Sequence, residues 1–465
     1  MMDRPDPEFF DLDALADDLG RPPVAPLAMP KQVLRGPRAM ARGLPALPVR
    51  VVAIRAVALT AAGLAAAAAF LLFLQYGAAD GLDALDLGRA GLILLTTWWL
   101  AWGAAQACVG LLAGMRAPRH GTASLRGRAV VIVPVYNEDA VATFARVAAM
   151  EASLAATGEG ARFSFAILSD TRNEGIAAEE RLWFLRLLRD TGGEGRIFYR
   201  RRADNPGRKA GNIEDFLTRS GGAYDYALIL DADSLMEGET IVEMVRRMEA
   251  DPRLGLLQTL PKVIRARARF GRAQQFSAAA FAPVFARGQA VMQGHAGPFW
   301  GHNALVRVAA FAQACGLPSL PGPAPFGGPI LSHDYVEAAM LARAGWTVRL
   351  DEDLEGSFEE GPETLIDHAK RDRRWCQGNL QHAGLIGARG LRPWSRFTFF
   401  QGIFAYLAPL FWLAFLALSI LAAITAPLHP DYFLPENPIP VFPIDMTGKA
   451  VALGFGIFGL LFLPK

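Results

Sequence analysis

Cysteine is scarce in this sequence, and the few that occur form no recognisable pattern. The three cysteines, Cys108, Cys315 and Cys376, lie far apart and include no Cys-X-X-Cys pair. A disulfide framework and a structural zinc site are therefore both disfavoured. Net charge is also nearly absent, because 47 Lys and Arg offset 45 Asp and Glu to leave +2 at pH 7. With no global positive charge, we expect no nucleic-acid partner.

Two nucleotide-binding signatures and a secretion signal are missing as well. No Gly-X4-Gly-Lys-Ser/Thr sequence occurs, which argues against a P-loop nucleotide site. No Gly-X-Gly-X-X-Gly sequence comes directly after Val133, where a dinucleotide-binding turn would lie, which argues against a dinucleotide dehydrogenase. Residues 1–20 are acidic and contain no apolar core, so no cleavable signal peptide is expected.

Long apolar runs are, by contrast, abundant, and hydrophobic residues make up 52% of the chain. Residues 51–76, 90–114 and 402–427 are each long enough to cross a bilayer, which needs about 20 apolar residues. A fourth run begins at Lys449 and stops with the sequence. We therefore expect a multi-pass membrane protein that has been cut from a larger one, or whose last helix continues in further sequence.

The charges around these runs predict how the chain is oriented. Arginines precede the first run and follow the second, whereas the loop between them carries Asp80, Asp83 and Asp86. The positive-inside rule then places both flanks in the cytoplasm and the acidic loop outside.

These features divide the chain into five segments. Residues 1–49 are expected to form a largely disordered cytoplasmic tail, and residues 50–116 two transmembrane helices joined by a short outer loop. Residues 120–390 form a long, mostly soluble insert. Residues 391–401 suit an amphipathic helix in the membrane interface, with a connecting loop as the alternative. Residues 402–465 hold a transmembrane helix, an outer loop and the start of a further transmembrane helix.

The insert alternates strand-like and helix-like patterns. Strands are predicted at residues 129–133, 163–168, 196–199 and 227–230, and helices at 140–156, 178–188 and 210–218. This βαβα order predicts an α/β fold with a parallel sheet and right-handed crossovers. Residues 274–293 predict a further helix, which we assign to the insert because Arg287 would be costly within a bilayer.

Polar groups follow each of the four predicted strands: Asn137 and Glu138; Asp170; Lys209 and Asn212; Asp231 and Asp233. In open α/β sheets, ligands bind just outside the carboxyl ends of the strands. Carboxylates there suit Mg²⁺, which prefers one or two carboxylates together with substrate phosphates. The pattern predicts a metal and nucleotide-diphosphate site, although a lone Asp-X-Asp is also typical of a solvated turn.

At these residues the insert resembles the GT-A catalytic domain of the family 2 processive glycosyltransferases, the group that contains cellulose and hyaluronan synthases. The matching segments are Pro134 to Glu138 (the opening motif), Asp170 (the uracil-contacting aspartate), Lys209 to Asn212 (Lys-Ala-Gly-Asn) and Asp231 to Asp233 (the metal motif). Ser332-His333-Asp334 departs from the family's Thr-Glu-Asp, and Arg371 to Trp375 from its Gln-X-X-Arg-Trp. The resemblance implies a Rossmann-like GT-A domain inserted between transmembrane helices. The departures put the acceptor and product in question more than the donor.

A narrower resemblance lies in Gly294 to Asn303, Ser332 to Asp334 and Arg371 to His382. These segments are similar to those of the glucosyltransferase H family, which builds osmoregulated periplasmic glucans, and the similarity runs from Val51 to the end. It implies a bacterial inner-membrane enzyme with a cytoplasmic catalytic domain and periplasmic outer loops. The implied reaction transfers glucose from UDP-glucose to a linear β-1,2-glucan that is exported. Because UDP-glucose is α-linked, a β product requires inversion in a single in-line displacement.

The resemblance also assigns roles to individual residues. Asp334 is the expected general base, and Asp233 the expected ligand of Mg²⁺ or Mn²⁺. The expected donor-binding residues are Pro134, Tyr136, Glu138, Asp170, Lys209, Asn212, Asp231, Asp233, Arg371 and Arg374, and the expected acceptor-binding residues are Trp300, His302, His333 and Trp375. Alternatives remain open for three of these assignments. Asp334 also suits the N-cap of a helix starting at Tyr335. Residues 371–374 also suit a contact with lipid headgroups, and His333 also suits a purely structural role.

The expected partners are UDP-glucose, the glucan acceptor and the lipid bilayer. The resemblance adds a periplasmic glucan-processing protein and acyl carrier protein. Three other functions compete with this reading: a cellulose-like β-glycan synthase, a lipid-acceptor family 2 glycosyltransferase, and a membrane-bound nucleotide-sugar sensor without turnover. The Arg374-Trp375 pair disfavours the lipid-acceptor enzyme.

Overall fold

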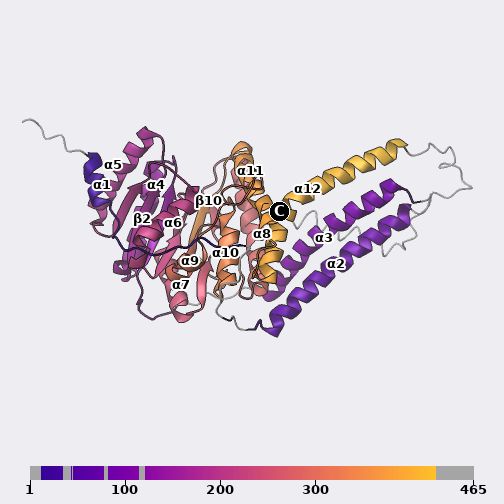
Figure 1. Cartoon of the computed structure of the whole chain (residues 1–465), viewed down its shortest axis with the longest axis horizontal. Coiled ribbons are helices and arrows are strands. Elements are labelled where there is room, and N and C mark those ends of the chain that lie inside the picture. The colour runs from indigo at the N-terminus through magenta and orange to yellow at the C-terminus, as the bar shows by residue number, and fades with distance from the viewer. Residues whose placement is uncertain (1–11, 35–42, 44–45, 78–81, 115–120, 426–465) are drawn as a thin grey trace, which may run out of the picture. The chain divides into compact units, whose positions relative to one another are not determined.

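A computed structural model of the chain describes residues 12–34, 43, 46–77, 82–114 and 121–425 (Figure 1). The chain divides into two compact units, which are described separately below. Unit 1 comprises Met1–Ala46, Met115–Ala279 and Gln293–Phe399, and unit 2 comprises Leu47–Gly114, Ala280–Met292 and Phe400–Lys465.

Unit 1 is built on a seven-stranded mixed sheet in the order β3-β2-β1-β4-β8-β6-β9. Its strands are β1 (Ala129–Val135), β2 (Phe163–Ser169), β3 (Ile197–Arg201), β4 (Tyr226–Ile229), β6 (Leu254–Gln258), β8 (Ala304–Arg307) and β9 (Thr347–Leu350). All four predicted strands are confirmed, and β3, β2, β1 and β4 run parallel. The expectation of a parallel sheet is wrong for β8, which pairs antiparallel with both β4 and β6.

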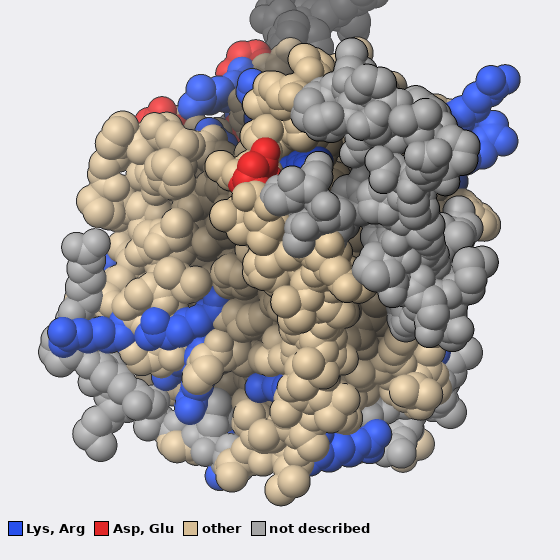
Figure 2. Space-filling view, turned by 90° about the vertical axis from the view of Figure 1, so that its right-hand side faces the viewer, with Lys and Arg blue, Asp and Glu red and all other residues tan. Residues whose placement is uncertain are grey.

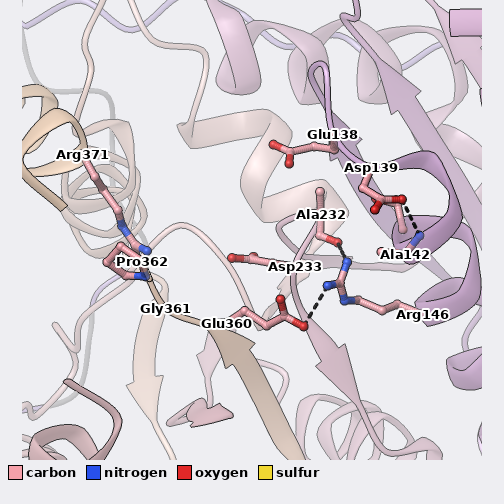
Figure 3. A pocket seen from close by; sticks show the side chains of 11 residues that line it. Glu138, Asp139, Ala142, Arg146, Ala232, Asp233, Glu360, Gly361, Pro362 and Arg371 are labelled. Atoms are coloured by element: carbon pink, nitrogen blue, oxygen red, sulfur yellow. Dashed lines mark hydrogen bonds and ion pairs between the residues drawn. The ribbon is translucent and has the colours of Figure 1, made fainter. Parts of the chain in front are cut away.

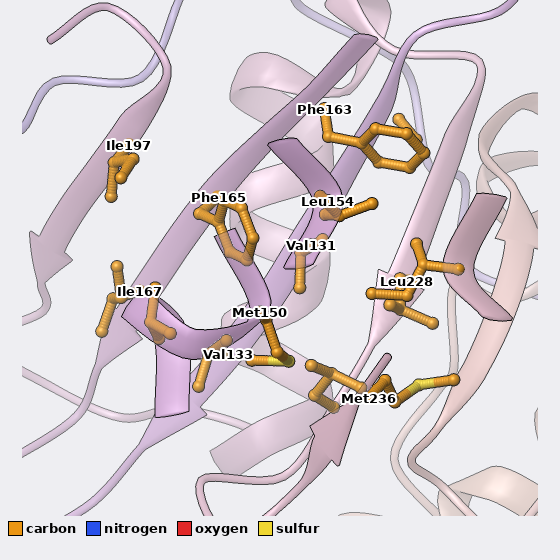
Figure 4. Close-up of a cluster of buried hydrophobic side chains, with 14 of the residues drawn as sticks. Val131, Val133, Met150, Leu154, Phe163, Phe165, Ile167, Ile197, Leu228 and Met236 are labelled. Atoms are coloured by element: carbon orange, nitrogen blue, oxygen red, sulfur yellow. The ribbon is translucent and has the colours of Figure 1, made fainter. Parts of the chain in front are cut away.

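Helices cover both faces of this sheet because alternate strand residues point to opposite sides. On one face, Val131, Phe165 and Leu228 pack against α4 (Ala140–Ala156), α5 (Glu174–Thr191) and α7 (Gly238–Ala250) (Figure 4). The other face, with Val130 and Ile132, packs against α6 (Arg208–Ser220), α9 (Val308–Ala314) and α10 (His333–Arg343). The strands are therefore buried on both sides, which explains their continuous apolar runs.

Three short strands form a second sheet in the order β5-β10-β7. These are β5 (Leu235–Met236), β7 (Lys262–Ile264) and β10 (Ser357–Glu360). Two further helices are α8 (Arg269–Met292), which covers the predicted 274–293 helix except its last residue, and α11 (Leu365–Gln381). Residues of α8 up to Ala279 belong to unit 1, and those from Ala280 belong to unit 2. Short 3-10 turns lie at Gly160–Arg162, Gly221–Ala223 and His382–Gly384.

Residues 12–34 pack against the rest of unit 1, which corrects the expectation of a disordered tail for this part of 1–49. Helix α1 (Leu12–Leu19) leads to Gly20, whose carbonyl accepts a 3.1 Å hydrogen bond from Tyr199 N on β3. Farther along, Ala25 N donates to Arg219 O at 2.9 Å, and Lys31 lies 2.5 Å from Glu214. Most of these contacts are made by the backbone, and such contacts leave no periodic pattern in a sequence.

Unit 2 contains long apolar helices at the three predicted spans. These are α2 (Val49–Gly77), α3 (Ala84–Ala113) and the unit 2 part of α12 (Pro393–Thr425), and all three helices are long and apolar enough to cross a membrane. Little of their surface is buried by protein, which suits contact with lipid. On the face drawn in Figure 2, uncharged residues cover most of the middle and acidic side chains are few.

Helix α12 is continuous, so residues 393–401 are helical and the alternative of a connecting loop is wrong there. No break separates this segment from the span that was predicted to start at residue 402. The predicted outer loop at 428–448 and the fourth run from Lys449 lie outside the described residues.

Candidate active site

The ends of β1 and β4 open onto a cavity of about 390 Å³ in unit 1 (Figure 3). Its walls come from the segment after β1, helix α4, the turn after β4, the end of β10, and α11: Glu138, Asp139, Ala142, Thr143, Arg146, Ala232, Asp233, Glu360, Gly361, Pro362 and Arg371. Three predicted donor-binding residues, Glu138, Asp233 and Arg371, meet here. Arg371 approaches from the side opposite to the two carboxylates.

Lys209 holds Asp231 at the edge of this site. Its ammonium group forms an ion pair with the Asp231 carboxylate and donates a 2.6 Å hydrogen bond to Gly301 O. Burial opposes ionisation of Asp231, but Lys209 and then His302 hold the pKa of this carboxyl below its ordinary value. Asp231 is therefore ionised near neutral pH and already has a cationic partner.

Asp233 is in the opposite situation. Burial, and then repulsion from Asp231, raise the pKa of Asp233 to about 6. Partial burial and the charges of Asp233 and Asp231 also raise the pKa of Glu138 across the cavity. Carboxylates that raise one another's pKa in this way lie in a site that is short of positive charge.

This donor set fits a divalent cation held mainly by Asp233, with Glu138 facing it. Within the described ranges no group of three or more His, Cys, Asp or Glu is placed to enclose a metal. The fit is therefore to a hard cation that takes one or two carboxylates and completes its shell with substrate phosphates and water.

Two other predicted donor-binding residues are held by arginines. Arg202 donates hydrogen bonds of 2.7 and 2.8 Å to the two carboxylate oxygens of the buried Asp170. Asn212 is 1% exposed, donates to Leu168 O at 3.1 Å, and accepts a hydrogen bond from Arg200. Asn212 thus braces the end of β2 from within the core and does not line the cavity of Figure 3.

The opening motif is mostly exposed. Pro134 is half-buried near the end of β1, and Tyr136 is 48% exposed. Neither lines the cavity, whereas Glu138 does. Asn137, which lies between them, accepts hydrogen bonds from the backbone nitrogens of Arg172 and Asn173 and so ties the ends of β1 and β2 together.

Asp334 lies beside the carbonyl group that Lys209 binds. A Cβ built on Gly301 would be 3.5 Å from Asp334 Oδ2, so Asp334 lies beside the residue whose carbonyl Lys209 binds. Gly301 has a φ of +86°, which favours glycine. Helix α10 begins at His333 with Ser332 as its N-cap, so Asp334 is not the N-cap residue. Burial raises the pKa of Asp334, which suits a group that must accept a proton.

His333 has a partner on its own helix. Its Nδ1 atom lies 3.1 Å from Glu337 Oε2, one turn along α10, and Glu337 is 4% exposed. Burial opposes protonation, but Glu337 raises the pKa of His333 above its ordinary value. The imidazole is thus bound to an internal carboxylate immediately next to Asp334.

Helix α11 presents the Arg371 to Trp375 segment. The Arg371 guanidinium lies 4.4 Å from the centre of the Trp375 ring, and Trp375 is 38% exposed. Arg374 is exposed and does not line the cavity. A ring held by a cation and open to solvent on part of its surface can stack on a sugar.

Trp300 and His302 belong to the loop that contains Gly301. Trp300 N donates a 3.0 Å hydrogen bond to Gln258 Oε1, and His302 Nε2 lies 3.3 Å from Glu359 Oε2. The Gln258 amide nitrogen also donates to His302 O at 3.0 Å. The end of β6 therefore fixes the shape of this loop.

Sequence analysis missed Gln258, Arg146 and Glu360, all of which shape the site. Arg146 had a detectable signal, because it is one of only two charged residues in the mainly apolar helix at 140–156. Gln258 and Glu360 end short strands that were not predicted, so nothing in the sequence marked them.

Comparison with known proteins identifies the family of this chain. The family models "Glycosyl transferase family 2" and "Glycosyl transferase family group 2" match residues 130–314 and 226–452. Glucans biosynthesis glucosyltransferase H of Cereibacter sphaeroides is 66% identical over 400 residues, which cover 85% of this chain and 67% of that protein. This chain belongs to the glucans biosynthesis glucosyltransferase H family.

Other members of the glucosyltransferase H family are more distant. That of Rhodopseudomonas palustris is 42% identical over 96% of this chain and 62% of its own length. That of Vibrio cholerae is 41% identical over 86% of this chain and 56% of its own length. The chain thus spans about half to two thirds of the length of the curated relatives it matches.

A solved structure confirms the predicted GT-A fold. It is a mannosyltransferase from Pyrobaculum calidifontis in complex with GDP-Man and Mn²⁺. The likeness has a TM-score of 0.52 at 17% sequence identity and covers 81% of this chain and all of that one. At this identity the likeness concerns the fold alone.

Proposed function

We propose that this chain is an inverting glucosyltransferase that transfers glucose from UDP-glucose to a growing linear β-1,2-glucan. The observation that carries the proposal is the position of Lys209. Its ammonium group binds both the Asp231 carboxylate and the Gly301 carbonyl, and Asp334 lies beside Gly301. Donor-side carboxylates and a candidate base therefore lie on either side of one lysine. The names of two relatives, which are 66% and 42% identical to this chain, support glucose as the transferred sugar and a glucan as the product.

The chain's own residues account for the proton and for the charge of the leaving group. The acceptor hydroxyl loses its proton to Asp334 as its oxygen attacks C1 of glucose, and the C1–O bond to UDP breaks on the opposite face. The raised pKa of Asp334 makes it a better base than an exposed aspartate. Arg371 and Lys209 supply positive charge near the departing diphosphate. Mg²⁺ or Mn²⁺ on Asp233 would neutralise further charge on the diphosphate.

Other residues are proposed to bind the two substrates. Asp170, with Arg202 beside it, faces the uracil, and Pro134, Tyr136 and Glu138 border the donor. Trp300, His302 and Trp375 contact the acceptor, where the partly exposed Trp375 ring provides a stacking surface. Asn212 and His333 act indirectly, because both side chains are bound within the protein. Arg374, which is exposed, contacts phosphate only if it moves toward the cavity.

The membrane spans support a location and a second role. We place the catalytic unit in the bacterial cytoplasm and the spans in the inner membrane, with synthesis coupled to export of the glucan. The three apolar helices and the arginine-rich flanks support this assignment. A periplasmic glucan-processing protein and acyl carrier protein remain proposed partners, on the family resemblance alone.

Purified full-length chain in a membrane mimetic, supplied with radiolabelled UDP-glucose and Mg²⁺ or Mn²⁺, tests this function. Linkage analysis of a labelled polymer should find 1,2-linked glucose. A polymer with another linkage would reject the β-1,2-glucan product and favour a cellulose-like synthase. Only short lipid-linked sugars would indicate a lipid-acceptor enzyme. Tight UDP binding without release of UDP from any nucleotide sugar would indicate a sensor.

A further inference from the structure

Arg146 is a charged residue that helix α4 places largely inside the protein. Its side chain is only 14% exposed. Its Nη1 group donates a 3.1 Å hydrogen bond to Ala232 O, and its Nη2 group donates a 2.9 Å hydrogen bond to Glu360 Oε1 (Figure 3). One guanidinium thus joins α4, the turn after β4 and the end of β10.

We infer that Arg146 is a positioning residue: acting through Ala232 and Glu360, it directs the Asp233 carboxylate into the cavity for binding of a divalent cation. This inference rests on the proposed function, since it concerns the same donor site.

The argument begins with the backbone around Asp233. The carbonyl that Arg146 binds belongs to the peptide joining Ala232 to Asp233, so fixing that oxygen fixes the peptide plane from which Asp233 extends. The other end of the turn is also fixed, because Asp231 N donates to Ser234 Oγ at 3.0 Å and Ser234 N donates to Asp231 O at 3.1 Å. With both sides held, the Asp233 side chain points into the cavity (Figure 3).

Glu360 extends the same restraint to the opposite wall. It pairs with Ile264 across the second sheet and lies 3.5 Å from Arg265. Gly361 and Pro362 follow it along the cavity wall and lead toward α11, which carries Arg371. Arg146 therefore connects the turn that carries Asp233 to the segment that leads to Arg371 on the opposite wall of the cavity.

Positioning and simple electrostatics predict opposite results when this arginine is removed. Arg146 lies in a cavity with Glu138, Asp233 and Glu360, so its positive charge disfavours a cation there. If charge alone mattered, Arg146→Gln would bind Mn²⁺ more tightly, and Arg146→Lys would bind it as the native protein does. If Arg146 positions Asp233, both variants bind Mn²⁺ more weakly, because neither makes both of its hydrogen bonds.

The experiment is a titration of the purified full-length chain with Mn²⁺ in the presence of UDP, followed by electron paramagnetic resonance. We expect the dissociation constant for Mn²⁺ to rise about tenfold in both variants, as for other residues that orient metal ligands. Glu360→Gln keeps an acceptor for Arg146 and should give a smaller rise. Glu151→Gln is the matched control. Glu151 also lies on α4 and forms an ion pair with an arginine, Arg196, at 2.8 Å, so this variant disrupts a similar pair and should leave Mn²⁺ affinity unchanged. Circular dichroism establishes that each variant is folded.

The outcomes separate this inference from the proposed function. Tighter Mn²⁺ binding by Arg146→Gln, or native binding by Arg146→Lys, would overturn the positioning role and leave the glucosyltransferase proposal intact. If Arg146→Gln does not fold, Glu360→Gln becomes the test. Mn²⁺ affinity of Glu360→Gln equal to that of the native protein would then overturn the positioning role. No UDP-dependent Mn²⁺ binding by the native chain would overturn both the role and the assigned metal site.

Discussion

Gly378 on α11 lies against Ser332, the residue that precedes His333 and Asp334. A Cβ on Gly378 would lie 2.6 Å from Ser332 N, so only glycine allows the helix this close. Three residues farther on, the buried Gln381 accepts a 2.9 Å hydrogen bond from Leu331 N. These two residues fix α11, with Arg371 and Trp375, against the segment that carries the candidate base.

Gly378→Ala should therefore separate α11 from the segment at Ser332. We expect transfer to fall about tenfold, and the free energy of unfolding to fall by about 1–3 kcal/mol, the usual cost of overpacking. Transfer assays and denaturant unfolding measure the two effects. Gly384→Ala is the control, because a Cβ at Gly384 would meet nothing within 4 Å. Equal activity of the two variants would show that this close approach does not matter for catalysis.

Asp334→Asn should remove transfer while leaving UDP binding intact. The amide keeps the size of the carboxylate but cannot accept the acceptor's proton, so a loss of about 10²- to 10⁴-fold is expected. Initial rates with UDP-glucose and calorimetric binding of UDP are the two measurements. Incorporation of glucose at the native rate would eliminate Asp334 as the base.

Cation binding should depend on pH because the pKa of Asp233 is raised to about 6. As the pH falls through about 6, Asp233 takes up a proton, and Mn²⁺ affinity should weaken. Asp233→Asn should bind Mn²⁺ weakly at every pH. An Asp233→Asn variant that keeps native affinity would exclude Asp233 as the ligand.

The same carboxyl affects stability in the opposite direction when no metal is present. Its folded-state pKa is higher than the unfolded value of about 3.9, so protonation favours the folded state. This stabilising contribution is complete below pH about 4 and is lost as the pH rises through about 6. Thermal unfolding between those values should show a fall in stability with rising pH that is smaller in Asp233→Asn.

Lys209→Met should cost more in activity than in stability. Asp231 would lose its cationic partner and the Gly301 carbonyl its donor, so we expect transfer to fall by about 10²-fold or more. Lys31→Met is the control, since Lys31 also pairs with a carboxylate, that of Glu214 on α6, but at an exposed position. That pair should be worth about 0–1 kcal/mol. Similar activities for the two variants would contradict the role of Lys209.

The sequence was most informative where an apolar strand ends in polar residues. The strands before Glu138, Asp170 and Asp231 were each predicted, and Glu138 and Asp233 do meet at one cavity. A hydrophobic run bounded by polar groups indicates both a buried strand and the position of its exposed end. This part of the fold can therefore be predicted from short stretches of sequence.

Long-range pairs were beyond such reasoning. Nothing near Asp170 in the sequence indicates that Arg202 binds it, and nothing near Ala232 indicates Arg146. The strand β8 was also missed, because its short apolar run cannot be distinguished from a helix segment by periodicity. Its antiparallel direction depends on its neighbours β4 and β6, which are distant in the chain.

The place of β8 has a consequence for how ribosomes produce this protein. Strand β4 is bordered by β1 on one side and by β8 on the other, yet β8 is made only after β5, α7, β6, β7 and α8 have been synthesised. Until then, one edge of β4 presents unpaired backbone groups, which are prone to pair with other chains. Nascent chains that stall before Ala304 should therefore aggregate, whereas those that extend past Arg307 can close the middle of the sheet.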